Sequence, residues 1–316
     1  MQNYFPERLL CRLAELGELT TNPARHSMRK EDMLAHLGDT DVVMTHWGSA
    51  KFDKDLLLHA PNLKIIAHCA GTVAPIASEE AYARGITVLS ANAVMSRYVA
   101  EWVLGAMLAS LRDFPVFDTM MRNGEWRQEN ARTKSLFDVE IGLIGLGTVG
   151  RELLKLLKPF GCRIKIYDPY IHDAFEQNIR LCSFEEALHA DIVSVHASQT
   201  PETYHLLNAE AISRIPDGAT LINSARGSIV DTEALIAELQ NGRIRAALDV
   251  FETEHCPQDA RLLHCTQNLI LQPHTAALPA GSRMTEAIIE DLERYAKGEK
   301  MQMTVSLEAF RRMTQE

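Results

Sequence analysis

A glycine-rich segment near the middle of the chain constrains the fold more than any other feature of the sequence. Residues 140–150 read EIGLIGLGTVG, in which Gly145, Gly147 and Gly150 fit the spacing G-x-G-x-x-G. An apolar run ends at Gly145 and helical periodicity continues over residues 151–160, which predicts a buried strand, a tight turn and a helix. Gly145 permits the turn, Gly147 lets backbone approach a pyrophosphate, and Gly150 lets the helix pack closely. The start of the helix would face the phosphates, so a redox function is the first hypothesis.

The acidic residue that such a unit needs stands at the end of the next predicted strand. That strand covers residues 163–167, and Asp168 follows it, 18 positions past Gly150. Its carboxylate suits the adenosine ribose hydroxyls and would repel a 2′-phosphate, and the next residue is Pro169 rather than an arginine. A glycine triplet alone also suits a flexible loop, but strand, helix and acid together favour a dinucleotide site. We therefore predict NAD as the cofactor, in preference to NADP.

Size and charge exclude several classes of function. The chain has 316 residues, of which 46% are hydrophobic, and a formal net charge of −10. This size favours two domains, and the acidity argues against nucleic-acid and membrane partners, because no Lys/Arg cluster is present to neutralise phosphates. The longest apolar helical stretch, residues 99–111, is too short to cross a bilayer, and residues 1–20 lack the layout of a signal peptide. We expect a cytoplasmic protein.

The cysteines predict reduced thiols rather than a disulfide framework. Six cysteines occur without a C-x-x-C pair, which fits a reducing compartment. The doublet His255-Cys256 and His264-Cys265 offers four soft ligands, but its spacing matches none of the usual zinc patterns. We expect no metal site.

Strand and helix patterns alternate along the chain. After the glycine segment, predicted strands cover residues 163–167, 191–196, 219–223, 244–251 and 269–272, with helical pieces between them. Before it, three short strands cover residues 41–45, 63–69 and 86–90, separated by helices such as 29–37 and 52–59. This alternation is typical of doubly wound parallel sheets.

The domain boundaries follow from two predicted helices. Residues 94–122 read as one long helix that connects the two domains, and residues 280–298 form a helix that returns to the first. We predict an α/β protein of two Rossmann-like, doubly wound domains. Residues 1–97 and 281–316 form a discontinuous, flavodoxin-like domain, and residues 98–280 form the NAD-binding domain.

Three chemically active side chains follow successive predicted strands of the second domain. Arg226, Glu254 and His274 each come shortly after a strand, and open α/β sheets bind ligands beyond the carboxyl ends of their strands. Taken singly, each has a structural interpretation: a salt-bridged turn residue, a solvated acid and a capping or core imidazole. Together, at one sheet edge beside a nicotinamide, they would make an acid/base site.

Longer motifs carry a resemblance to a known family. They are GLIGLGTVG at 142–150, TPET at 200–203, INSARGSIVD at 222–231, ALDVFETE at 247–254 and QPHT at 272–275. In these motifs the chain resembles the D-isomer-specific 2-hydroxyacid dehydrogenases, relatives of phosphoglycerate and glycerate dehydrogenases, over nearly its full length. A weaker match, YVAEW at 98–102, falls where the family's interdomain helix begins.

The resemblance implies a role for each of these residues. Arg226 would hold the substrate carboxylate and polarise its 2-keto oxygen, His274 would be the general acid/base, and Glu254 would orient the imidazole. Cofactor contacts are implied for Thr148 and Val149 at the pyrophosphate, Asp249 at the nicotinamide carboxamide, and Thr200 and Ala225 nearby. The implied reaction is hydride transfer between NAD and a small D-2-hydroxy or 2-keto acid.

The chain departs from the family pattern at two loops. A Gly-Val-Gly-Tyr-Asp-like substrate loop is common in the family, whereas residues 69–75 here read CAGTVAP. Where Glu-Pro commonly follows the aspartate motif, this chain has EHCP at 254–257. The first departure leaves the identity of the acid open, and the second alters the loop that carries Glu254.

The altered loop still suggests how the first domain binds substrate. We expect the backbone N–H groups of Gly71, Thr72 and Val73, together with Arg226, to hold the carboxylate. Residues 69–75 contain no Lys or Arg, and Arg97 is the only cation that we can name nearby. A short acid such as glyoxylate or hydroxypyruvate is therefore favoured over phosphoglycerate.

Two alternatives and the assembly state remain open at this point. An NAD(H)-sensing regulatory or corepressor-like module on the same fold would keep the same motifs, and so would a bare cofactor-binding domain. We also expect a homodimer, formed through the long helix, whose apolar residues exceed what one sheet face needs. Those residues are Trp102, Val103, Met107, Leu108 and Leu111.

Overall fold

The computed structural model describes residues 4–22, 27–126, 132–172, 178–254, 260–265 and 269–314. They form two compact units, a first unit of Met1–Ser96 and Ala277–Glu316 and a second unit of Arg97–Ala276. The chain passes from the first unit to the second within helix α5 (Asn92–Leu111). Each unit contains one parallel β-sheet, which confirms the predicted α/β class with two parallel-sheet units.

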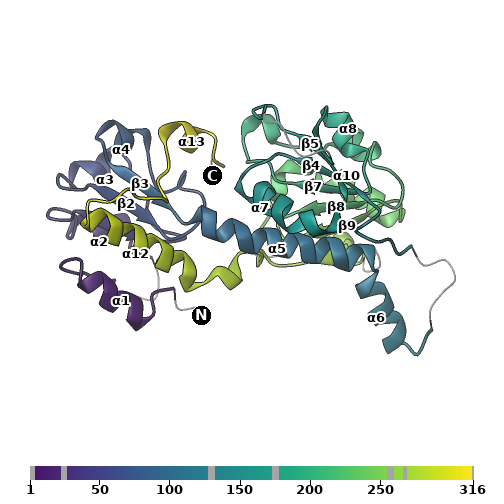
Figure 1. Ribbon diagram of the computed structural model, residues 1–316, viewed down its shortest axis with the longest axis horizontal. Coiled ribbons are helices and arrows are strands. Elements are labelled where there is room, and N and C mark those ends of the chain that lie inside the picture. The colour runs from purple at the N-terminus through teal and green to yellow at the C-terminus, as the bar shows by residue number, and fades with distance from the viewer. Residues whose placement is uncertain are drawn as a thin grey trace. The chain divides into compact units, whose positions relative to one another are not determined.

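The first unit is built on a sheet of three described strands, β1 (Val42–Thr45), β2 (Ile65–His68) and β3 (Thr87–Ser90), in that order. In the ladder Val42 stands opposite Ile65, and Ile65 opposite Thr87. One face of the sheet is covered by α3 (Lys54–Leu58) and α4 (Glu79–Ala83), the other by α1 (Glu7–Ala14) and α12 (Ser282–Ala296) (Figure 1). A further short helix, α2 (Lys30–Leu34), precedes β1. The three predicted strands are confirmed.

Both ends of the chain contribute to the first unit. Helices α1 and α12 lie side by side, joined by ion pairs from Arg8 to Glu286 at 2.6 Å and from Arg12 to Glu293 at 2.8 Å. Beyond α12, the N–H of Val305 donates to a carbonyl of β3 at 2.8 Å, and α13 (Leu307–Arg311) packs nearby. The C-terminal segment is thus part of this unit.

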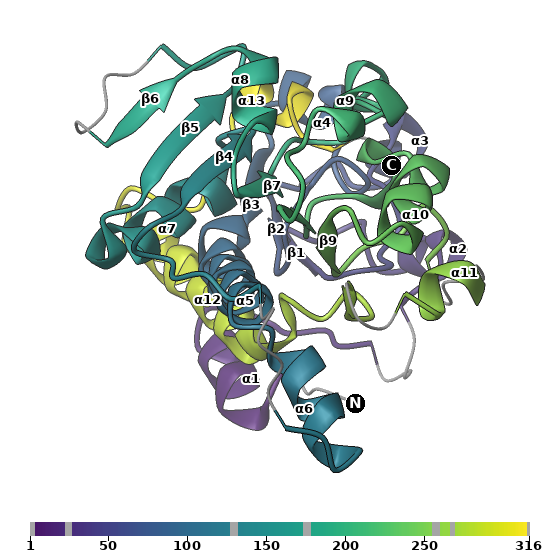
Figure 2. The same cartoon turned by 90° about the vertical axis from the view of Figure 1, so that its right-hand side faces the viewer.

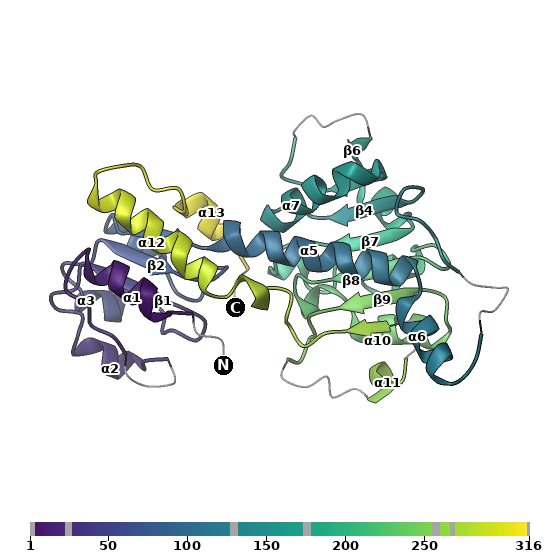
Figure 3. The same ribbon diagram turned by 60° about the horizontal axis from the view of Figure 1, so that its bottom comes forward.

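The second unit contains a seven-stranded parallel sheet of order β10-β9-β8-β7-β4-β5-β6 (Figure 3). Its strands are β4 (Glu140–Ile144), β5 (Arg163–Tyr167), β6 (Ile179–Leu181), β7 (Ile192–Val195), β8 (Thr220–Asn223), β9 (Arg245–Leu248) and β10 (Leu269–Leu271). Going outward from β4, β5 and β6 lie on one side and β7 to β10 on the other. The order of the sheet therefore reverses at β4, and ligands bind at such switch points.

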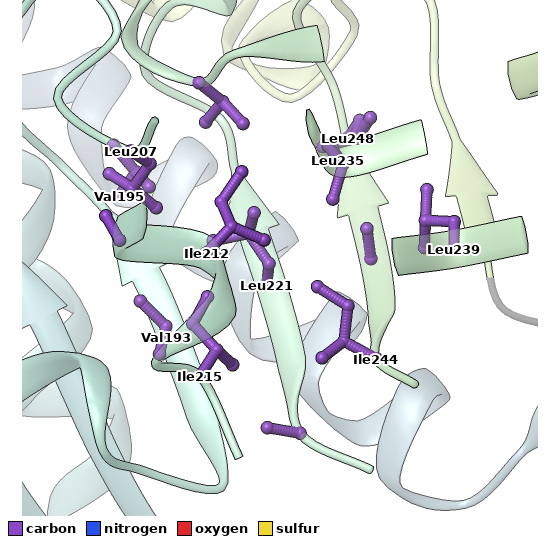
Figure 4. Close-up of a cluster of buried hydrophobic side chains, with 14 of the residues drawn as sticks. Val193, Val195, Leu207, Ile212, Ile215, Leu221, Leu235, Leu239, Ile244 and Leu248 are labelled. Carbon is purple, nitrogen blue, oxygen red and sulfur yellow. The ribbon is translucent and has the colours of Figure 1, made fainter. Parts of the chain in front are cut away.

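The core of the second unit lies on both faces of this sheet. On one face, α9 (Ala209–Ser213) and α10 (Thr232–Gln240) bury Ile212 and Leu235 against Val193 and Leu221 (Figure 4). On the other, α5 and α7 (Thr148–Leu157) cover β4 and β5. Each fully buried Leu or Ile side chain contributes about 1.5–3 kcal/mol relative to exposure. This packing fixes the strand ends on which the site is built.

One glycine of β4 explains a close contact that the sequence analysis missed. A Cβ on Gly142 would lie 1.8 Å from the carbonyl oxygen of Ala187 in α8 (Phe184–Leu188). Helix α8 therefore packs with its backbone directly on the central strand. Strand β6 and helix α1 were also not predicted, because they have only three and eight residues, fewer than the window over which periodicity is decisive.

The prediction of one helix over residues 94–122 is wrong. Helix α5 ends at Leu111, and a separate helix α6 (Phe114–Arg122) begins after Asp113, which has a left-handed φ of 51°. Pro115 in the first turn of α6 has no N–H to continue the helix. Arg245 stabilises the break, since its guanidinium donates to Ser110 O at 2.9 Å and pairs with Asp113 at 3.0 Å.

The proposed dimer face also requires correction. Val103, Met107 and Leu111 are buried in the core of the second unit, and Trp102 and Leu108 pack against that core. Val103, Met107 and Leu111 therefore serve the sheet face, and of the five only Trp102 and Leu108 keep partly exposed surface. Helix α6, in contrast, buries none of its residues and projects from the second unit (Figures 2 and 3).

In the part of the chain that the structure describes, no helix is long and apolar enough to span a membrane.

Candidate active site

The glycine turn after β4 has the geometry of a phosphate cradle. Gly145 has a φ of 91°, and a Cβ there would lie 2.7 Å from the backbone nitrogen of Ala197. Gly147 is the N-cap of α7, and no side chain caps the helix. A Cβ at Gly147 would meet only a carbonyl oxygen of His196, at 3.9 Å. The turn therefore needs Gly145 for its conformation, and at Gly147 it leaves open space beside an uncapped helix N-terminus, where an anion is favoured.

Asp168 ties the glycine turn to the end of β5. One carboxylate oxygen accepts the N–H of Leu146 at 2.8 Å, and the other accepts the N–H of Tyr170 at 2.9 Å. Each oxygen keeps a further lone pair for an additional donor. The acid thus lies beside the glycine turn, as a ribose contact requires, and it also stabilises that turn, which the sequence analysis did not anticipate.

The other predicted cofactor residues follow strand ends of the same sheet. Thr148 and Val149 open α7 directly after the glycine turn. Thr200 caps the short helix 201–203, where its N–H donates to the hydroxyl of Thr203 at 2.8 Å. Ala225 follows β8, and its N–H donates to the Asn223 side chain at 3.0 Å. These residues and the open cradle at Gly147 fit a dinucleotide along the carboxyl edge.

Arg226 lies in a turn that a buried asparagine holds. The side chain of Asn223, which is 1% exposed, accepts from Ala225 and donates to Arg226 O at 2.9 Å. The Arg226 guanidinium contacts Ala225 O at 2.8 Å. The hydroxyl oxygens of Ser224 and Ser228, on either side of Arg226, are buried and lack a hydrogen-bond partner among the described residues. The turn therefore fixes the backbone of Arg226 beyond the end of β8.

His274 and Glu254 form a hydrogen-bonded pair from neighbouring strand ends. The imidazole Nδ1 lies 2.7 Å from Glu254 Oε2. A carboxylate only accepts hydrogen bonds, so this contact places the proton of a neutral imidazole on Nδ1. The other nitrogen, Nε2, has no hydrogen-bond partner among the described residues and is available for proton exchange with a ligand. The structure therefore brings together two of the three predicted catalytic residues.

Asp249 holds the turn that carries His274. This carboxylate is 1% exposed, and it accepts the N–H groups of Thr275 at 2.8 Å and of Ala276 at 3.0 Å. His274 N donates to Asp249 O at 2.8 Å, and His274 has a left-handed φ of 55°. Burial raises the pKa of Asp249, and the two backbone donors oppose that shift. Strained backbone of this kind persists where its surroundings hold it, often at functional sites.

The loop that follows β2 in the first unit offers backbone donors. In the described residues, no partner is found for the N–H groups of Gly71, Thr72 and Val73. The hydroxyl of Ser90 donates to the carbonyl oxygen of Gly71, so the carbonyl side of the loop is satisfied. Burial without a partner is costly for a backbone N–H, and Gly71 and Val73 are buried. An anionic ligand would satisfy these groups.

The structure groups the predicted residues by unit. Arg226, Glu254, His274 and the cofactor residues lie at the carboxyl edge of the larger sheet, and residues 69–75 lie in the other unit.

Sequence reasoning missed a second imidazole–carboxylate pair in the larger unit. His205 Nε2 lies 2.5 Å from Glu252 Oε1. The motif TPET, which ends two positions before His205, and Glu252 within ALDVFETE were the available signals.

The cysteine doublet gives no metal cluster in what is described. His255 and Cys256 lie outside the described residues, whereas His264 and Cys265 follow α11 (Ala260–Leu263). In the ranges given above, no group of three His, Cys, Asp or Glu side chains is arranged to hold a metal ion.

Comparison with known families identifies the second unit. Residues 104–276 match the family model described as D-isomer specific 2-hydroxyacid dehydrogenase, NAD binding domain. This range contains the glycine turn and the edge residues of the larger sheet, which is therefore an NAD(P)-binding unit.

Individual relatives cover both units. The chain is 32% identical over 302 residues to a D-3-phosphoglycerate dehydrogenase of Methanocaldococcus jannaschii, which covers 93% of the chain and 56% of that protein. It is 33% identical over 318 residues to a glyoxylate reductase of Thermofilum pendens, with 97% and 93% covered. The crystal structure of the TT0316 protein from Thermus thermophilus superposes with a TM-score of 0.78 at 29% identity, covering 95% of this chain and 97% of that one. The chain spans about half the length of the phosphoglycerate dehydrogenases that it matches.

Proposed function

Because the chain belongs to the D-isomer-specific 2-hydroxyacid dehydrogenase family, we propose that it interconverts a small 2-keto acid and its D-2-hydroxy acid with NAD(H). The observation that carries this proposal is the contact of 2.7 Å between His274 Nδ1 and Glu254 Oε2. It leaves Nε2 to exchange a proton with a substrate oxygen. A unit that only bound the cofactor would not require this pair.

The chain's own residues supply acid/base chemistry and charge stabilisation. NAD(H), when bound, supplies the hydride in reduction and accepts it in oxidation. In reduction, the imidazolium form of His274 would donate its Nε2 proton to the substrate oxygen as the keto carbon gains the hydride, which leaves the neutral imidazole protonated on Nδ1. Arg226 offsets the negative charge that develops on that oxygen and anchors the carboxylate. Glu254 keeps the imidazole in the orientation and tautomer that this step needs.

We assign the cofactor to the larger unit and substrate selection to the smaller one. Gly145, Gly147 and Gly150 hold the pyrophosphate with Thr148 and Val149. Further contacts come from Asp168 at the ribose, Asp249 at the nicotinamide carboxamide, and Thr200 and Ala225. The predicted boundaries, residues 1–97 with 281–316 and residues 98–280, describe the same division of roles. NAD is preferred to NADP because a 2′-phosphate would meet the Asp168 carboxylate.

The substrate is a short acid held by its carboxylate between Arg226 and the N–H groups of Gly71, Thr72 and Val73. Among the described residues, these N–H groups have no hydrogen-bond partner, which supports the assignment. Residues 69–75 also contain no Lys or Arg. A phosphorylated acid would require more cationic partners than this loop provides. Among relatives of similar identity, one is a glyoxylate reductase and one a phosphoglycerate dehydrogenase. We favour glyoxylate or hydroxypyruvate.

The active assembly is a homodimer in this proposal. Helix α6 and the segment after it expose Phe114, Met121 and Trp126, which are 59%, 55% and 74% accessible. Large apolar side chains grouped on a projecting helix favour burial in an interface. Light scattering at micromolar concentration tests this, and a monomeric mass would contradict it.

Steady-state kinetics tests the function as a whole. The purified chain is assayed with NADH and with NADPH against glyoxylate, hydroxypyruvate, pyruvate and 3-phosphohydroxypyruvate, following absorbance at the nicotinamide band. We expect turnover with NADH, higher kcat/KM for NADH than for NADPH, and preference for a short unphosphorylated acid. NADH binding without turnover on any acid would favour the regulatory alternative. A clear preference for 3-phosphohydroxypyruvate would contradict the substrate assignment.

A further inference from the structure

His205 connects two loops that carry the proposed catalytic residues. Its main-chain N–H donates to Ser228 O at 2.8 Å, in the short helix 227–229 that directly follows Arg226. Its imidazole Nε2 lies 2.5 Å from Oε1 of Glu252, two positions before Glu254. One residue therefore contacts the Arg226 turn through its backbone and the Glu254 loop through its side chain.

The backbone of His205 makes this connection specific. Its φ is 46°, in the left-handed region that glycine adopts most easily. A histidine occupies this position although glycine would avoid the strain, and the imidazole is the group that a glycine would lack. The ring also stacks on Tyr204, with centroids 4.1 Å apart. That contact restricts the direction in which Nε2 points.

Among the described residues, the Glu254 loop is held mainly by this contact, by the bond between Glu254 and His274 and by Gly227 at its start. Gly227 packs against its start, where a Cβ would lie 1.9 Å from the carbonyl carbon of Phe251. Beyond that point, Glu252, Thr253 and Glu254 are exposed. A cavity of about 420 Å³ borders Phe251, Glu252 and Thr253 on the side of α10. A loop beside a cavity has few packed neighbours to fix it, so a side-chain bond to His205, in the segment that follows β7, determines more of its position.

We propose that His205 and Glu252 are positioning residues, which hold the Glu254 loop against the Arg226 turn so that Glu254 meets His274 in the correct orientation. This inference rests on the proposed function for its kinetic consequence, but the contact between Glu254 and His274 can be observed without turnover. Neither residue touches the reacting atoms in this scheme. Because both side chains are about 30% exposed, the pair contributes mainly to geometry and little to overall stability.

Kinetics of three variants tests the proposal. His205→Gly keeps the favourable backbone, Glu252→Ala removes the acceptor, and Glu252→Gln keeps a hydrogen-bonding oxygen. We expect the first two to lower kcat about five- to ten-fold with KM for NADH unchanged, since a small misplacement affects the reaction step. The double variant should be no slower than either single one, and Glu252→Gln should retain most of the rate. Glu210→Ala, which removes an exposed carboxylate 2.6 Å from Arg214, is the matched control and should change nothing.

Histidine NMR provides a readout that does not depend on activity. In protein with ¹⁵N-labelled imidazoles, the resonances lost in His274→Ala identify His274, and its Nδ1 shift reports the tautomer that Glu254 selects. We expect one Nδ1-protonated tautomer in the parent chain and a mixture in Glu252→Ala. Unchanged His274 resonances, additive rate losses or a full kcat in both variants would each overturn the proposal. If the parent chain turns over no acid while the His274 signal still changes, the proposed function fails and the positioning role stands.

Discussion

The two units present the same architectural feature, the carboxyl edge of a parallel sheet, with different chemistry. At the edge of the larger sheet, side chains form defined pairs, such as Glu254 with His274, and Asp249 with the turn beyond β10. At the edge of the smaller sheet, the loop after β2 offers backbone N–H groups instead, beside buried uncharged side chains such as His68. Side-chain chemistry defines the reaction, and backbone donors define only where an anion fits.

This difference explains why one unit suggests an activity and the other leaves its substrate open. Acid/base catalysis needs particular residue types at particular strand ends, which limits the sequences that can supply it. Backbone donors are present in every residue, so many sequences provide them equally well. Substitutions that alter one sheet edge and leave the other unchanged therefore test this difference.

Loss of the imidazole should give the largest effect. His274→Ala should lower kcat by roughly 10² to 10⁴, because it removes the proton donor from the larger unit's edge. NADH affinity should stay nearly unchanged, since none of the proposed cofactor contacts comes from the His274 side chain. Stopped-flow binding and steady-state rates measure the two separately. Near-normal turnover would show that the acid/base assignment is wrong.

Substitution of Gly227, which lies against the backbone of the Glu254 loop, should have the next largest effect. A Cβ at Gly227 would lie 1.9 Å from Phe251 C and 2.3 Å from Glu252 N, and backbone atoms have no alternative rotamer. We expect Gly227→Ala to reduce the free energy of unfolding by about 3 kcal/mol, the upper range for overpacking, and to reduce turnover as well. Denaturant unfolding measures the first effect. Gly105→Ala, where a Cβ meets nothing within 4 Å, is the control and should be neutral or slightly stabilising.

The sequence predicted the larger unit well for physical reasons. Buried parallel strands such as β4, which reads EIGLI, are mostly apolar runs, and the glycine turn after β4 needs glycine at Gly145 because its φ is 91°. These constraints act on single residues and short segments. The family, the fold class and the pairing of the residues after β9 and β10 followed from them.

Features that depend on distant contacts were beyond the sequence. The break between α5 and α6 is held by Arg245, which lies more than 130 positions away from Ser110 and Asp113. The second role of Asp168 arises from the neighbouring ends of β4 and β5, and the contact of His205 with Glu252 joins segments that follow β7 and β9, which β8 separates in the sheet. Periodicity and motif spacing contain no information about such pairings until the order of the strands is known.

Acid should destabilise the smaller unit before the larger one. Burial lowers the pKa of His46 and of His68 in the first unit to about 4, and in the second unit it lowers the pKa of His196 to about 4. A histidine whose pKa is lower in the folded chain than in the unfolded chain takes up its proton in the unfolded chain at a higher pH. The free energy of unfolding therefore falls as pH drops from about 6.5 to about 4. In the larger unit the raised pKa of Asp249 acts in the opposite direction.

Hydrogen exchange measured by mass spectrometry between pH 7 and pH 4.5 tests this difference. We expect protection of β1 and β2 to decrease at a higher pH than protection of β7 and β8. Replacing His68, which is 2% exposed, should reduce the loss of the first unit's free energy of unfolding between pH 7 and pH 4.5. The reduction should be at most about 3 kcal/mol. Equal loss of protection in both units would contradict the assignment of the difference to these histidines.

The smallest effect is expected at the loop of the first unit. A Cβ at Gly71 would lie 2.5 Å from Met95 Cε and 3.1 Å from its Sδ, and the flexible end of a methionine can move aside. Gly71→Ala should therefore change the free energy of unfolding by less than about 1 kcal/mol. If the N–H groups of this loop bind the substrate carboxylate, the added methyl group and the moved Met95 side chain beside them should raise KM for the keto acid a few-fold, with kcat and NADH affinity unchanged. Gly71→Ala combined with Met95→Ala, which removes the steric conflict, should restore KM. An unchanged KM in Gly71→Ala would assign carboxylate binding to Arg226 alone.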